Sequence, residues 1–176
     1  LKGVLHSLSS EKTRLKSVIT EAESTNESLA KSNVGAENII EELETVPETE
    51  IYIVDDDFLV DRNRILRFCD MLEEKGIHKK YLIYGRADFI ASNEDVIKRF
   101  KEVGLRAVIV GLESCDSNEL VDYNKKSNVA INEQAVVILK RYDVECYGTF
   151  ILGLDWRWED FKALGKWIKK LGLVFV

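Results

Sequence analysis

Six short apolar runs are spaced along the chain, and each predicts a β-strand. They lie at residues 3–8, 51–54, 81–84, 107–110, 145–152 and 173–176. Most of these runs are continuously apolar and do not alternate with polar residues. That pattern is typical of strands that are buried on both faces of a parallel sheet.

Apolar residues at helical spacing fill the gaps between these runs. Val96, Phe100 and Val103, for example, share one helical face. Three of the predicted helices end at a glycine shortly before the next strand, namely at Gly76, Gly104 and Gly172. The repeated order of strand, helix, glycine and strand predicts an α/β protein with parallel strands and right-handed crossovers.

The first 35 residues differ from the rest, because they are rich in Ser, Glu, Asn and Thr. Leu15, Val18 and Ala22 nevertheless keep helical spacing, which predicts an amphipathic helix. A second helix is predicted over residues 36–45. We therefore divide the chain into a helical segment at 1–35 and an α/β core at 36–176. A degenerate first strand-and-helix unit is the other interpretation of residues 1–35.

Polar residues follow each central strand of the predicted sheet. Asp55, Asp56 and Asp57 follow the run at 51–54, and Arg86 follows the run at 81–84. The later runs lead into two further groups, Glu113–Ser114 and Gly148–Gly153. Ligands of parallel α/β folds bind at the carboxyl ends of the strands, so these residues predict a shared pocket.

Each of these residues also has a purely structural interpretation. Loop aspartates commonly cap helices, which applies to Asp57 and Asp61, and loop glycines commonly turn the chain. Arg86 has nearby carboxylates in Asp56 and Asp88 with which it could pair. The prediction of a functional site rests on the four groups together and not on one residue.

Composition and charge narrow the classes of function. With 25 Lys and Arg against 31 Asp and Glu, the net charge of −6 gives no indication of nucleic-acid binding. No apolar run approaches the roughly 18 residues of a membrane span. Three scattered cysteines suit reduced thiols in a cytoplasmic protein, and not a disulfide framework or a Cys-type zinc site. Because the chain opens on Leu1, we expect it to be a piece of a longer protein.

Four blocks of sequence, in this order, resemble radical S-adenosylmethionine (SAM) enzymes, most closely the subgroup often fused to cobalamin-binding domains. The blocks are Ile-Tyr-Ile-Val-Asp-Asp-Asp-Phe from Ile51, Gly-Arg-Ala-Asp from Gly85, Gly-Leu-Glu-Ser from Gly111 and Gly-Thr-Phe-Ile-Leu-Gly from Gly148. The resemblance covers about residues 36–176. It implies a partial, open (β/α)6 barrel of parallel strands, because six strands are too few to close the usual eight-stranded form.

The resemblance also implies a role for each block in binding SAM. Asp55, Asp56 and Asp57 would hold its amino group. Arg86, Glu113 and Ser114 would lie near its carboxylate and ribose. The fifth-strand block would offer backbone groups and an apolar surface to adenine, through Gly148, Phe150, Ile151 and Gly153. Physically, a zwitterion needs both charge signs, and ribose hydroxyls need acceptors.

One feature of the family is missing from the sequence. Radical SAM enzymes bind a [4Fe–4S] cluster through Cys-x3-Cys-x2-Cys after the first strand, and the chain contains no such motif. Cys69 and Cys115 have unrelated positions and spacing. Either the cluster site has been lost, or residues 1–32 are not the first unit of the barrel. In both cases we do not expect cluster-dependent SAM cleavage from the chain as given.

The leading hypothesis is a SAM-binding core of a cobalamin-associated radical enzyme, or of a degenerate homologue without its iron–sulfur site. A first alternative is a Mg²⁺-dependent hydrolase or phosphotransferase that uses Asp55–Asp57, Glu113 and Asp155 as ligands. A second alternative is a non-catalytic nucleotide-binding or scaffold domain. The small-molecule substrate is not identified by the sequence. Unpaired sheet edges predict self-association or a missing companion domain.

Overall fold

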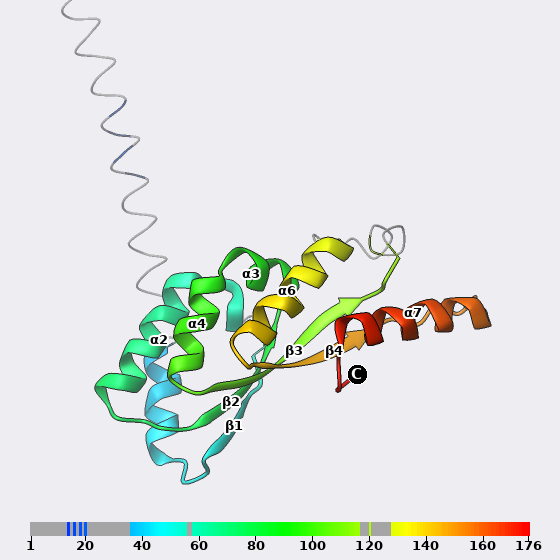
Figure 1. Ribbon diagram of the computed structural model, residues 1–176. Coiled ribbons are helices and arrows are strands. Elements are labelled where there is room, and N and C mark those ends of the chain that lie inside the picture. The colour runs from blue at the N-terminus through cyan, green and yellow to red at the C-terminus, as the bar shows by residue number, and fades with distance from the viewer. Residues whose placement is uncertain are drawn as a thin grey trace, which may run out of the picture.

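The computed structural model describes residues 14, 16, 18, 20, 36–55, 58–116, 120 and 128–176 of the chain. Four strands form one parallel sheet in the order β1-β2-β3-β4 (Figure 1). The strands are β1 (Glu50–Ile53), β2 (Lys80–Gly85), β3 (Leu105–Glu113) and β4 (Glu145–Phe150). Each described strand pairs with the next strand along the chain. The predicted α/β fold with parallel strands is confirmed.

Helices connect the strands as the apolar spacing predicted. They are a helix at 36–45, η1 (Phe58–Val60), α2 (Arg62–Glu74), α3 (Ala87–Ser92), α4 (Glu94–Glu102), α6 (Val129–Arg141) and α7 (Trp158–Leu171). Asp61 caps α2, because its carboxylate accepts hydrogen bonds from the backbone N–H groups of Asn63 and Arg64. Gly172 has a φ of 57° and ends α7 in the left-handed conformation that glycine adopts easily.

The hydrophobic core lies between one face of the sheet and its helices. Phe58, Phe68, Tyr81 and Phe100 are almost fully buried there, and their neighbouring ring centroids lie 5.4–5.9 Å apart. Tilted and edge-to-face contacts of this kind add to the free energy gained from burial alone. We call this side the sealed face of the sheet.

The opposite face, which we call the open face, carries Tyr52, Leu82, Tyr84, Ile109 and Tyr147. Strand side chains alternate between faces, so Leu82 and Tyr84 point away from the core that contains Tyr81 and Ile83. Tyr52 is 44% exposed and contacts Tyr84, with ring centroids 5.7 Å apart. Parallel sheets are normally covered on both faces. A parallel sheet with one covered face has the form of part of a barrel wall.

Two of the six predicted strands are not among the strands of the described sheet. The run at 173–176 makes a single parallel bridge, between Phe175 and Tyr147, and is not a strand. The N–H of Gly148 donates to the Phe175 carbonyl at 3.1 Å, but the ladder extends no further. The run at 3–8 lies outside the described residues. The four central strands all appear near their predicted positions.

The helix predicted at 36–45 is confirmed, and Arg14, Lys16, Val18 and Thr20 are helical. Most of residues 1–35 lie outside the described part of the chain. The proposed division at residue 35 therefore stays a prediction. Within the described residues, no helix is long and apolar enough to cross a membrane.

Candidate functional site

The carboxyl ends of the four strands bring the described members of the predicted site to one end of the sheet. Asp55 follows β1, Arg86 follows β2, Glu113 is the last residue of β3, and Ile151 follows β4. The backbone N–H of Ile151 donates to the carbonyl of Glu113 at 2.9 Å, which joins the ends of β3 and β4. Asp56 and Asp57 lie outside the described residues.

Glu113 has an unusual backbone. Its φ is 64°, in the left-handed region that glycine favours. The N–H of Ser114 donates to the carbonyl of Leu112 at 2.8 Å, which closes a three-residue γ-turn around Glu113. Turns of this kind are rare and strained. The pairing of β3 with β4 also shifts register between Gly111 and Glu113. The end of β3 is thus irregular at the residue that was predicted to bind the ligand.

Gly111 makes room for the Glu113 carboxylate. A Cβ atom added at Gly111 would lie 2.6 Å from Glu113 Oε1, so any larger residue would collide with the carboxylate. The same position is 4.0 Å from Thr149 Oγ1 on β4. Gly111 and Thr149 are paired across the two strands, and their residues alternate with those of the sealed face. The carboxylate therefore lies over the open face, near the carboxyl end of the sheet.

Two polar residues are fully buried beneath this turn. The Ser114 hydroxyl accepts a hydrogen bond from the Asp116 N–H at 2.9 Å. Asn132 of α6 donates from Nδ2 to the carbonyl of Leu112 at 2.8 Å. Sequence reasoning named Ser114 but missed Asn132. Helical spacing could have indicated that Asn132 is buried, because it stands three and four residues before Ala135 and Val136, which lie on the buried face of the same helix.

The other charged members of the predicted site have partners nearby. Arg86 donates to Asp88 from Nε and NH2 at 3.0 and 2.7 Å, and this hydrogen-bonded pairing lowers the pKa of Asp88. The alternative interpretation of Arg86 as a partner of Asp88 is confirmed. Asp55 accepts a hydrogen bond from Arg64 NH2 at 2.8 Å, and the guanidinium of Arg64 lies 5.5 Å from the ring of Phe58.

Gly148 and Phe150 of β4, and Gly153 after it, have packing roles. A Cβ atom at Gly148 would lie 3.0 Å from a methyl of Leu112 and 3.3 Å from a methyl of Leu173. The ring of Phe150 meets Trp167 of α7 edge-on, with centroids 6.2 Å apart. A Cβ at Gly153, after the strand, would collide with Trp156. Close packing alone accounts for glycine at 148 and 153, and the predicted contact of this block with adenine stays a prediction.

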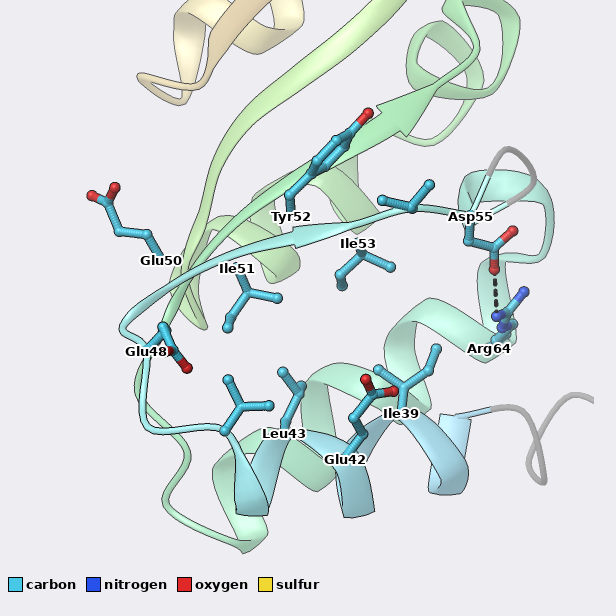
Figure 2. Close-up of a pocket in the computed structure, with 12 residues that line it drawn as sticks. Ile39, Glu42, Leu43, Glu48, Glu50, Ile51, Tyr52, Ile53, Asp55 and Arg64 are labelled. Atoms are coloured by element: carbon cyan, nitrogen blue, oxygen red, sulfur yellow. Dashed lines mark hydrogen bonds and ion pairs between the residues drawn. The ribbon is translucent and has the colours of Figure 1, made fainter.

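A groove of about 960 Å³ runs along the edge of β1 (Figure 2). Ile39 and Leu43 of the helix at 36–45 form one wall, and β1 forms the other. Asp55 and Arg64 stand at one end of the groove, where Figure 2 shows their ion pair. Within the described residues β1 pairs only with β2. The groove thus follows an edge that could accept another strand, and it reaches the predicted site only at Asp55.

The described cysteines do not fit a [4Fe–4S] cluster. Cys69 lies in α2 and Cys146 in β4, and burial raises the pKa of each thiol to about 12, whereas cluster ligands are thiolates. Cys115 follows β3 and is half-buried. In the part of the chain that the structure describes, no three His, Cys, Asp or Glu side chains come together as metal ligands.

No protein-family model matches the chain. A hopanoid C-3 methylase of Methylococcus capsulatus is 25% identical over 138 residues, which are 78% of this chain and 27% of the methylase. Among solved structures, the cobalamin-dependent SAM radical enzyme OxsB, with aqua-cobalamin and SAM bound, is similar with a TM-score of 0.66. That match has 17% identity and covers 76% of this chain and 22% of OxsB.

A second similar structure is the radical SAM methyltransferase TsrM of Kitasatospora setae, with cobalamin and a [4Fe–4S] cluster bound. Its TM-score is 0.59 at 13% identity, over 71% of this chain and 26% of TsrM. The predicted resemblance is therefore confirmed, and the chain has the α/β fold of radical SAM enzymes that include cobalamin-dependent ones. It spans about a quarter of the length of these proteins.

Proposed function

We propose that the chain is the SAM-binding core of a cobalamin-associated radical SAM enzyme, or of a homologue that lacks the cluster ligands. The observation that supports this most is the placement of the Glu113 carboxylate. It lies over Gly111 at the carboxyl end of the open face, on which Tyr52 remains 44% exposed. An ionised carboxylate accepts hydrogen bonds and donates none, which suits the paired hydroxyls of a ribose.

The charged ends of SAM would meet the ends of β1 and β2. Asp55 would accept from the amino group, and Arg86 would donate to the carboxylate. Each already has a partner, in Arg64 and Asp88 respectively. The Arg86 side chain is about half exposed, and exposed ion pairs are worth little in stability, so the pair can be exchanged at low cost. Ile151, 39% exposed, would offer an apolar surface and backbone groups to the adenine.

When bound, SAM supplies an activated methyl group and an adenosyl group. The described residues of this chain bind and orient that molecule and do not provide thiolates for a cluster. A [4Fe–4S] cluster or a cobalamin, if the whole protein uses them, would be held by residues outside those described here. The small-molecule substrate and the reaction would be properties of the whole protein, and this chain alone does not identify them.

The Mg²⁺-dependent alternative has less support. Of its five proposed ligands, Asp55 is hydrogen-bonded to Arg64, and Glu113 lies over Gly111. The described residues contain no cluster of three suitable ligands, while Asp56 and Asp57 lie outside them. The scaffold alternative draws on the groove beside β1, which suits a docked strand.

Calorimetric titration of the purified chain with SAM, S-adenosylhomocysteine and Mg²⁺ distinguishes the SAM-binding core from the Mg²⁺-dependent enzyme and the scaffold domain. We expect both nucleosides to bind with dissociation constants of roughly tens of micromolar to millimolar, because no cluster contributes to the affinity. Glu113→Ala should weaken binding further without unfolding the chain. Glu102→Ala, an exposed change at the end of α4, is the control and should not weaken binding. No binding by the unmodified chain at millimolar nucleoside would contradict the proposal.

A further inference from the structure

Glu113 is held in a conformation that its own residue type disfavours. In the described part of the chain only Glu113 and Asp143 combine a side chain with a positive φ. Asp143 stands in the turn after α6, where aspartate tolerates the left-handed region. Glutamate has no such preference, and a strained residue persists only where its surroundings over-determine it. The contacts of Leu112, Asn132 and Ile151 meet that requirement.

The carbonyl of Leu112 is held in place by hydrogen bonds from two sides of the turn. It accepts two hydrogen bonds, from the Ser114 N–H at 2.8 Å and from Asn132 Nδ2 at 2.8 Å. Asn132 is fully buried, and a buried amide is costly unless it is hydrogen-bonded. It reaches Leu112 from α6, twenty residues further along the chain. The orientation of the peptide that precedes Glu113 is therefore tied to a helix on the sealed face.

The remaining contacts define where the carboxylate goes. The Ile151 N–H donates to the carbonyl of Glu113 at 2.9 Å and fixes the second peptide of the turn. With both peptides fixed, the side chain folds back over Gly111, where the lack of a Cβ leaves room for the carboxylate. Asn132 thus positions the carboxylate indirectly, through the Leu112 carbonyl, and Gly111 leaves the space that the carboxylate occupies.

We propose that Asn132 and Gly111 are positioning residues for the Glu113 carboxylate, and that they set the affinity of the site at the carboxyl end of the sheet for a nucleoside ribose without touching the ribose. The inference rests on the proposed function. It adds that α6, which carries no residue of the predicted site, acts on the ligand site through the hydrogen bond from Asn132 to the Leu112 carbonyl.

A double-mutant cycle tests the coupling. SAM affinity is measured for Asn132→Leu and Gly111→Ala, each alone and combined with Glu113→Ala. We expect each single change to weaken binding about tenfold, the effect of one hydrogen bond to a charged group. In the Glu113→Ala background the same changes should alter affinity less than about twofold. Equal losses in both backgrounds, or no loss from either single change, would overturn the proposal.

Two variants distinguish a specific effect on binding from a general loss of structure. Gly111→Ala displaces only the end of a flexible side chain, so it keeps the proposal testable if Asn132→Leu does not fold. Gly165→Ala, in α7, is the matched control. Nothing lies within 4 Å of the added Cβ, and the affinity should not change.

A ligand-free measurement separates this inference from the proposed function. The Cα and Cβ chemical shifts of Glu113 report its φ and are compared between the unmodified chain and Asn132→Leu. We expect the shifts of a positive φ in the first and their loss in the second. Unchanged shifts would overturn the positioning role even if SAM binds. If SAM does not bind at all, the proposed function fails, and these shifts still decide whether Asn132 holds the turn.

Discussion

The two faces of the one sheet are built from the same strands and have opposite surroundings. On the sealed face, Tyr81 of β2 packs against Phe68 of α2 and Phe100 of α4, and all three are almost fully buried. On the open face, Tyr52 and Tyr84 have each other as aromatic neighbours and remain partly exposed. Alternate residues of a strand therefore have separate tasks. One set packs in the core, and the other keeps part of its surface exposed.

The largest expected difference between the faces is in stability. Phe100→Ala removes a ring that contacts three other aromatic residues of the sealed face, and it should lower the free energy of unfolding by about 3–5 kcal/mol. Tyr52→Ala on the open face is the matched variant and should cost about 1 kcal/mol or less, because the ring is already 44% exposed. Urea denaturation followed by fluorescence measures both, and equal losses would remove the distinction between the faces.

Thiol reactivity gives the next largest contrast. Burial raises the pKa of Cys69 and Cys146 to about 12, so both stay protonated at pH 8, where thiolate is the reactive form. The half-buried Cys115, which follows Ser114 of the predicted site, should react with a disulfide reagent about a hundredfold faster than either. Mass spectrometry of the labelled peptides identifies the site. Fast labelling of all three thiols in the native chain would show that the sealed face opens readily.

A smaller effect is expected at the start of α2, which covers the sealed face. Asp61→Ala removes the two hydrogen bonds that cap the helix and should cost about 1 kcal/mol. Asn128→Ala removes the single described cap of α6, to Ile131 N, and should cost about the same or less. Thermal unfolding by circular dichroism measures both. A cost near zero for Asp61→Ala would mean that packing alone fixes the helix.

The sequence predicted the order of elements well and the surroundings of the sheet poorly. Apolar runs located all four described strands, and Gly76, Gly104 and Gly172 all adopt positive φ values at the ends of helices. The same continuous runs, however, predicted strands covered on both faces. Tyrosine counts as apolar in such a pattern whether or not it is covered, so Tyr52 and Tyr84 gave no sign of an open face. Residues 173–176 were apolar enough to predict a strand, but only Phe175 pairs with a strand, in a single bridge to Tyr147.

For the candidate site, the sequence predicted which residues follow the strands but not how they are held. Position after a strand is enough to bring Asp55, Arg86 and Glu113 to one end of the sheet. The pairing of Arg86 with Asp88 was foreseeable because the two are close in the chain. The positive φ of Glu113 was not, since no local signal marks glutamate for that conformation. It depends on Asn132, which is distant in sequence and comes close only when α6 packs on the sheet.

The most direct test of the central claim, that the open face at the carboxyl end of the sheet is the ligand site, is a nuclear magnetic resonance titration of the ¹⁵N-labelled chain with SAM. We expect the largest amide shifts at Gly111, Glu113, Thr149 and Ile151. Amides at the amino ends of the strands, such as those of Lys80 and Glu145, should not move. No shifts at millimolar SAM, or shifts confined to the amino ends or to the groove beside β1, would contradict the account.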